Sequence, residues 1–220
     1  MKATLQHQER RTSSAFTLIE IIGVVAVIAI LAAVLTPRVV SVIARGKVSA
    51  TAQSLGSLKS ATADYIGKNG SLPARAGTGA TNSAVATGRF DTDLVTGGFA
   101  EKLFACSIGT QTFDASALTG RIHVRSVTAA SAATVTAPTA TTGGDNFNLD
   151  RETSTADFTT SQTVVSAFIP GVSISDAIAL NTILDGDVNT GTSADTTGRC
   201  IYSAAATDNT VTVIVYIAHY

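Results

Sequence analysis

The sequence has few of the residues that most often carry catalysis or bind polyanions. It has no tryptophan, 5% aromatic and 14% charged residues, and a formal net charge of −1 at pH 7. Such a chain lacks the basic surface that nucleic-acid binding requires. Its three histidines form no ligand pair, and Gly-x-Ser-x-Gly, phosphate-loop and Cys-x-x-Cys motifs are absent from the sequence. We therefore predict that the protein is not an enzyme and has no nucleic-acid partner.

One long apolar run dominates the chain, from Phe16 to Thr36. As an α-helix it would span roughly 31 Å, the thickness of the hydrocarbon core of a bilayer. Glu20 is its one ionisable side chain and lies near its beginning. A charge inside a membrane costs about 2.5–3.5 kcal/mol on insertion scales. We infer that this carboxylate has a partner, and that the partner belongs to a second copy of the same chain.

Residues 16–20 read Phe-Thr-Leu-Ile-Glu. They follow a short basic leader and precede an apolar helix that contains Pro37. This arrangement resembles the N-terminus of the type IV pilin and pseudopilin family. The resemblance implies that a prepilin peptidase removes residues 1–15. It also implies methylation of the new Phe16 amine and assembly into a helical filament. The family usually has Gly before the cut, where this chain has Ala15, another small residue.

The charges around the apolar run fit this processing. The leader is net positive, which keeps it in the cytoplasm under the positive-inside tendency. The candidate cleavage site precedes the apolar run, whereas a secretory signal is cut after it. Cleavage would keep the helix as an anchor and create a cation on Phe16 that can neutralise Glu20 of a neighbouring subunit. A plain signal anchor, in which Glu20 is incidental, is the alternative.

The helix is expected to continue beyond the apolar run. Apolar residues recur every three or four positions after Pro37, which is the period of an amphipathic helix, so we predict a kink at this proline rather than an end. Residues 68–70, Lys-Asn-Gly, supply a basic last turn and a C-cap. We expect one helix over residues 16–66. Its first part, 16–36, would lie in the membrane or filament core, and 37–66 would support a head.

Residues 67–220 are expected to form one globular head rich in β-structure. Predicted strands cover residues 121–125, 146–151, 163–169, 200–204 and 210–217, and predicted short helices cover 94–104 and 176–184. Ser175 is expected to cap the second short helix, and Pro170-Gly171 to end the third strand. The predicted fold class is α+β, with a long N-terminal membrane-spanning helix packed on an antiparallel sheet, as in pilins.

Two cysteines, Cys106 and Cys200, fall in the predicted head. Outside the inner membrane an oxidising compartment favours a disulfide between them. The bridge would close a loop of about 95 residues and stabilise the fold by about 4–5 kcal/mol in the chain-entropy model. Two buried thiols that pack as small apolar groups are the alternative.

A short acidic segment is the best metal candidate. Asp185, Asp187 and Asn189 alternate beside a glycine, like the start of an EF-hand loop, and Asp195 follows. These four residues are candidate ligands of a structural calcium ion, and the sequence predicts no other cofactor. The closing Glu of such a loop is missing from the sequence. A turn that caps the preceding helix is the alternative and needs no metal.

The predicted function is that of a structural subunit of a type IV pilus-like filament. Its partners would be further copies of the chain, the prepilin peptidase and the pilus or type II secretion assembly machinery. It would cross the bacterial inner membrane once before assembly and then enter a periplasmic or extracellular filament. One alternative is a pseudopilin of a type II secretion system. The second is a membrane-anchored periplasmic domain that never polymerises.

Overall fold

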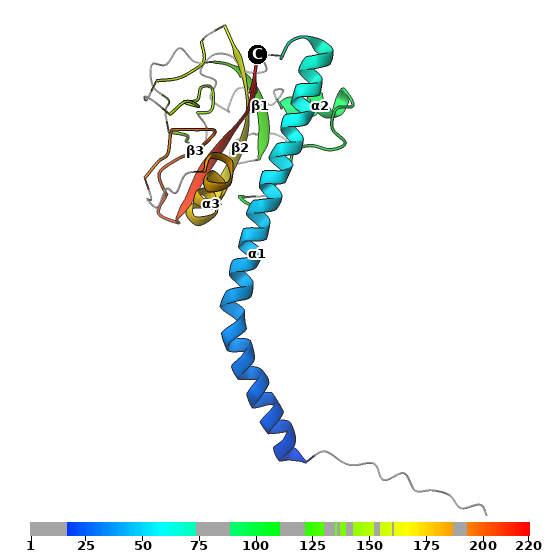
Figure 1. Ribbon diagram of the computed structural model, residues 1–220, viewed down its shortest axis with the longest axis vertical. Coiled ribbons are helices and arrows are strands. Elements are labelled where there is room, and N and C mark those ends of the chain that lie inside the picture. The colour runs from blue at the N-terminus through cyan, green and yellow to red at the C-terminus, as the bar shows by residue number, and fades with distance from the viewer. Residues whose placement is uncertain are drawn as a thin grey trace, which may run out of the picture. The chain divides into compact units, whose positions relative to one another are not determined.

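The computed structural model describes residues 17–73, 89–110, 122–129, 135, 137–139, 143–151, 155–159, 161–186 and 193–220. Over these residues the chain has α+β architecture, with helices α1 to α3 and strands β1 to β4 (Figure 1). It divides into two compact units, Met1–Ile43 and Ala44–Tyr220. The predicted α+β class with an antiparallel sheet is therefore confirmed.

Helix α1 extends over Leu18–Asn69 and includes Pro37 in its interior. Proline lacks the N–H group that would bond to the carbonyl four residues earlier, yet the helix continues, as the apolar pattern predicted. Immediately before the proline, the Thr36 hydroxyl donates to the carbonyl of Ala32 at 2.7 Å. At the other end Gly70 adopts a left-handed φ of 69°, which terminates the helix. The kink at Pro37 stays a prediction.

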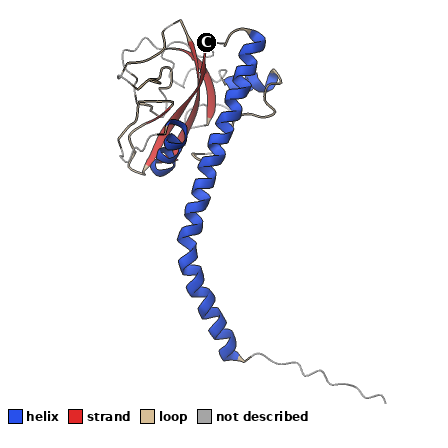
Figure 2. Ribbon diagram, in the orientation of Figure 1, coloured by secondary structure: helices blue, strands red, loops and turns tan. Residues whose placement is uncertain are grey.

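The second half of α1 has one buried face, as its sequence period predicted. The buried side chains recur every three or four residues, and they are Val48, Thr51, Leu55, Leu58, Ala61 and Thr62. Their apolar members belong to the main core cluster together with residues of the sheet. This part of α1 lies alongside the sheet in Figure 2. Residues from Ala44 onward therefore fold as part of the head.

The sheet is antiparallel and has the strand order β1-β2-β4-β3. Its strands are β1 His123–Thr128, β2 Thr163–Ser173, β3 Cys200–Tyr202 and β4 Thr210–His219. The C-terminal strand β4 is central, because it pairs with β2 on one side and with β3 on the other.

Side chains alternate between the two faces of the sheet, and each face has its own core. On β2, Val165 and Ala167 belong to the main cluster with α1, whereas Val164 and Phe168 belong to a second cluster. Helix α3 (Ile174–Asp185) also contributes to the main cluster. Loop residues such as Phe147 cover the second face. Both faces of the sheet are therefore covered by packed side chains.

Four of the five predicted strands exist in the structure, but their limits differ from the predicted ones. Strand β1 begins at His123 rather than at residue 121. Strand β2 continues through Pro170 and Gly171, which were expected to end it, because a register shift between Ile169 and Val172 accommodates them. The strand predicted over residues 146–151 is wrong, since that segment makes only an isolated bridge from Asn148 to Gly198.

Two helix boundaries also differ from the predictions. The predicted helix over residues 94–104 is α2, Phe90–Thr96, which ends where Gly97 and Gly98 follow. Helix α3 begins at Ile174, and its cap is Ser173 rather than the predicted Ser175. The Ser173 hydroxyl accepts a hydrogen bond from the Asp176 N–H at 3.2 Å. Either serine satisfied the sequence rule, and the bond made in the fold decides between them.

Candidate functional site

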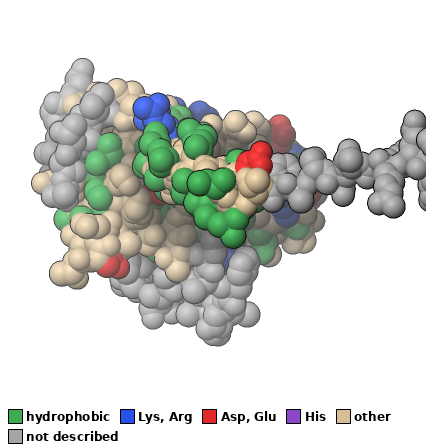
Figure 3. All heavy atoms as spheres, turned by 90° about the horizontal axis from the view of Figure 1, so that it is seen from below, with side chains coloured by type: hydrophobic (Ala, Val, Ile, Leu, Met, Phe, Trp, Pro, Cys, Tyr) green, Lys and Arg blue, Asp and Glu red, His purple; other side chains and the backbone are tan. Residues whose placement is uncertain are grey.

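The most unusual surface in the structure is the first half of α1. Its large apolar side chains are exposed, from 51% for Ile21 to 79% for Leu18. Figure 3 shows hydrophobic side chains at the surface of this end of the molecule. The helix is long and apolar enough to cross a membrane. A soluble monomer does not leave so much contiguous apolar surface in water, so this segment requires lipid or protein around it.

Glu20 lies in the first turn of this helix, where it forms a capping box with Thr17. The Thr17 N–H and hydroxyl both donate to Glu20 Oε2 at 3.4 Å, and the Glu20 N–H donates to Thr17 Oγ1 at 3.4 Å. The carboxylate also lies at the positive end of the helix dipole. Sequence reasoning gave Glu20 no partner within the chain. The signal that could have identified one is the Thr-x-x-Glu spacing of residues 17–20.

The structure describes only some of the other predicted processing and assembly residues. Ala15 and Phe16 lie outside the described residues, together with the rest of the predicted leader. Pro37 lies in the exposed segment of α1. Of the three predicted assembly residues, the structure therefore describes Glu20 and Pro37.

The predicted disulfide between Cys106 and Cys200 is not present in the structure, which contains both residues as buried thiols. The Cys106 thiol donates to the carbonyl of Ile108 at 3.1 Å. Cys200 is fully buried in β3. Both sulfur atoms belong to the main core cluster, where they act as small apolar groups. The alternative of two packed thiols is the one that the structure shows.

We expect both thiols to resist modification until the head unfolds. In the native chain a membrane-permeant alkylating reagent should react with neither, and after denaturation without reductant it should add to both cysteines. Intact mass before and after unfolding measures this. A chain that takes up alkyl groups only after reduction would contain the disulfide instead.

Burial of these thiols predicts a loss of stability at alkaline pH. Burial raises the pKa of Cys106 from 9.0 to about 11, although the hydrogen bond to Ile108 acts in the opposite direction. The pKa of Cys200 is also raised, first by burial and then by the charges of Asp185 and Asp195. Above pH 9 the unfolded chain loses its thiol protons first, so it binds fewer protons than the folded chain. The free energy of unfolding therefore falls as the pH rises.

Denaturant unfolding between pH 9 and pH 11 measures this effect. The shift of Cys106 alone corresponds to about 2–3 kcal/mol. The variant Cys106→Ala should show a flatter pH dependence than the wild type. Tyr216, whose pKa is also raised by burial, is present in both chains, so its titration does not contribute to the difference between their slopes. Equal slopes for the two chains would contradict the prediction.

Two of the four predicted calcium ligands, Asp185 and Asp195, form hydrogen bonds within the chain. The Asp185 carboxylate accepts hydrogen bonds from the backbone N–H groups of Arg199 and Cys200, at 2.8 to 3.1 Å. Asp195 accepts from the Asn181 amide at 2.8 Å and from Thr197. These bonds attach the end of α3 and the segment before β3 to one another.

The other two predicted ligands, Asp187 and Asn189, lie outside the described residues. Within the described part of the chain, His, Cys, Asp and Glu form no group of three or more that could hold a metal. Gly186 has a left-handed φ of 75°, and its N–H bonds to the Thr182 carbonyl. The described atoms thus make the turn that caps α3, and the calcium site stays a prediction.

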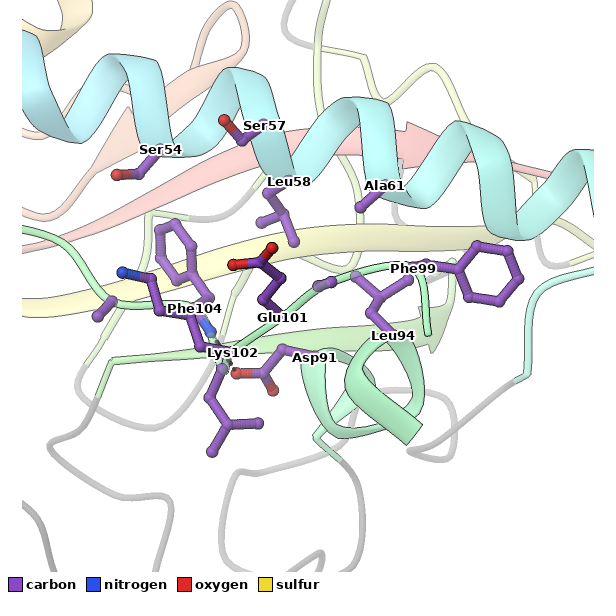
Figure 4. A pocket seen from close by; sticks show the side chains of 13 residues that line it. Ser54, Ser57, Leu58, Ala61, Asp91, Leu94, Phe99, Glu101, Lys102 and Phe104 are labelled. Atoms are coloured by element: carbon purple, nitrogen blue, oxygen red, sulfur yellow. Dashed lines mark hydrogen bonds between the residues drawn. The ribbon is translucent and has the colours of Figure 1, made fainter. Parts of the chain in front are cut away.

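A groove of about 410 Å³ lies between α1 and the segment after α2 (Figure 4). Its apolar lining includes Leu58 and Leu94, and the Glu101 side chain points into it. The Asp91 carboxylate at its edge is engaged by Arg89 at 2.6 Å and by the Phe104 N–H at 3.1 Å. The two serines of the described lining, Ser54 and Ser57, donate their hydroxyls to the carbonyls of Ala50 and Gln53 in their own helix.

Comparison of the chain with protein-family models, with curated proteins and with solved structures finds no match.

Proposed function

We propose that this chain is a structural subunit of a type IV pilus-like filament. The observation that carries the proposal is the exposed apolar half of α1 with a single carboxylate in its first turn. Before assembly this segment would cross the inner membrane. In the filament, the same segments of neighbouring copies would replace the lipid and bury each other's side chains.

The carboxylate gives the assembly its selectivity. In lipid, Glu20 has only its contacts with Thr17, which leave its charge uncompensated. A neighbouring copy that was cut after Ala15 would offer the α-amine of Phe16. An ion pair between Glu20 and that amine would neutralise both charges within a low-dielectric environment. The resemblance of residues 16–20 to the pilin and pseudopilin motif supports the same arrangement.

Two alternative functions would also use the apolar N-terminal helix. A pseudopilin of a type II secretion system would use the same helix and carboxylate in a short periplasmic filament. A membrane-anchored periplasmic domain that never polymerises is favoured by one specific observation, the capping box between Thr17 and Glu20, because it gives the carboxylate a role within a single chain.

Intact mass with N-terminal fragmentation, on material sheared from the surface of native cells, tests the proposal. We expect a species that begins at Phe16, with or without a methyl group, and that retains both thiol hydrogens. The same species found only in membranes would favour the pseudopilin. A chain that still begins at Met1 would contradict processing, and the simple anchor would then be the better account.

A further inference from the structure

A shift in register near the end of β4 brings two polar side chains together on one face of the sheet. Val164 pairs with His219 and Ser166 pairs with Tyr216, so β4 has one residue more than β2 between these two pairs. In a regular strand, side chains three residues apart point to opposite faces. Because of the extra residue, Tyr216 and His219 share a face, and the Tyr216 hydroxyl lies 2.6 Å from Nδ1 of His219.

Arg199, immediately before β3, lies on the same face of the sheet. Its carbonyl accepts a hydrogen bond from the Tyr216 N–H at 2.8 Å, which continues the register that pairs Ile201 with Ile214 in the second core cluster. Residues that pair directly across two strands place their side chains on one face. Burial raises the pKa of Tyr216, and the charge of Arg199 lowers it. Arg199, Tyr216 and His219 therefore converge at one end of the sheet.

Aromatic rings hold the tyrosine and the histidine in place. The Phe158 ring is nearly parallel to that of Tyr216, with centroids 5.7 Å apart and an angle of 14°, and its centroid is 4.7 Å from that of His219. The edge of Phe147 meets the Tyr216 ring at 5.5 Å. Both phenylalanines are buried, Tyr216 is half-buried and His219 is exposed. The polar atoms thus lie at the rim of a packed core, where a ligand from solvent can reach them.

We propose that Arg199, Tyr216 and His219 form a binding site for an oxyanion, the carboxylate or phosphate group of a small molecule. The guanidinium group offers such an anion two parallel N–H donors. When the Tyr216 hydroxyl donates to Nδ1, the neutral His219 ring has its proton on Nε2 and presents a further N–H donor. When Nδ1 donates instead, the Tyr216 O–H is the further donor. Either tautomer therefore places a neutral donor beside the cation.

Asp157, which precedes Phe158, is the competing anion within the chain. Its Oδ2 atom accepts a hydrogen bond from the Leu149 N–H, and its own N–H donates to the Phe147 carbonyl at 2.9 Å. These bonds attach Asp157 to the loop that covers the second face of the sheet. We therefore expect Asp157→Asn, which keeps an acceptor for Leu149, to leave the affinity for an added anion unchanged.

Anion titration of the full chain in detergent tests the proposal. The chain has three histidines, so ¹⁵N-histidine labelling gives few signals, and the ring nitrogens report on tautomer and hydrogen bonding. Acetate or inorganic phosphate replaces chloride at constant ionic strength, which keeps the screening of charges unchanged. The His219 signals should shift and saturate, whereas those of His123, which is fully buried, should not move. Saturation with acetate alone would identify a carboxylate site, and saturation with phosphate alone a phosphate site.

Arg199→Gln should weaken anion binding about tenfold or more, the factor that corresponds to one charge-assisted hydrogen bond. Lys102→Gln is the matched control, because it removes an exposed cation from the segment after α2 and should keep the wild-type affinity. A response that does not saturate, or equal affinities in Arg199→Gln and the wild type, would overturn the proposal. So would tighter binding by Asp157→Asn, since that carboxylate would then occupy the site. The wild-type titration against chloride decides the matter even where a variant fails to fold.

Discussion

Replacing Glu20 with glutamine is expected to abolish filament assembly while the subunit still inserts into the membrane. Glutamine can still accept hydrogen bonds from Thr17, so the capping box remains. The negative charge is lost, however, and the Phe16 amine of a neighbour would be buried without a counter-charge. Leaving one member of a buried ion pair unpaired costs about 3–5 kcal/mol, a factor of roughly 150 to 5,000 in each subunit contact. Sheared surface fractions and membrane fractions, probed for the chain, measure the two steps separately.

The variant Thr17→Val is the matched control for this experiment. It removes the side-chain half of the capping box and keeps the charge of Glu20. Loss of a helix cap costs about 1 kcal/mol, so filaments should still form. Normal filaments from the Glu20→Gln chain would contradict the proposed pairing. In that case the capping box alone would account for the carboxylate, and the non-polymerising anchor would become the better explanation.

Replacing Asp185 with alanine should destabilise the head by about 3–5 kcal/mol. The side chain is only 2% exposed, and Arg151 Nη2 lies 3.8 Å from its Oδ1 atom. Its carboxylate is the acceptor for two backbone N–H groups, those of Arg199 and Cys200. The substitution leaves both donors without this acceptor, next to a fully buried cysteine. Urea unfolding of the full chain in detergent, followed by circular dichroism, measures the change.

Asp208→Ala provides the comparison for a carboxylate at the surface. Asp208 accepts hydrogen bonds from Thr210, which lower its pKa, but the residue is exposed, so its removal should change stability little. Similar losses for the two variants would contradict the assignment of Asp185 as a buried attachment point. If a chelator reproduces the effect of Asp185→Ala in the wild-type chain, the carboxylate instead acts through a bound metal ion.

Sequence periodicity was sufficient for the elements whose burial follows a regular pattern. The three-to-four residue spacing after Pro37 identified the buried face of α1 from Val48 to Thr62. Alternation and β-branched residues located β2 and β4. These predictions succeed because burial against a flat partner imposes a fixed period on the sequence.

Elements that depend on tertiary contacts were predicted less well. Pro170 and Gly171 usually end a strand, yet β2 continues because β4 pairs again beyond the shift in register. Which serine caps α3, and whether Cys106 meets Cys200, are decided by positions in space that the spacing of residues does not contain. At the candidate site, the sequence identified Glu20 and the apolar segment, but the hydrogen bonds of Thr17 became evident only in the structure.

The central place of β4 sets the order in which the head can be completed. Among the strands of this sheet, the last to be synthesised is β4, which joins β2 to β3. Until residues 210–219 have been synthesised, β2 and β3 each lack a neighbour, and their hydrophobic side chains stay uncovered. A chain that stops before β4 thus has an open sheet edge, which invites pairing with other chains and proteolysis. The head therefore completes its fold only in a chain that includes β4.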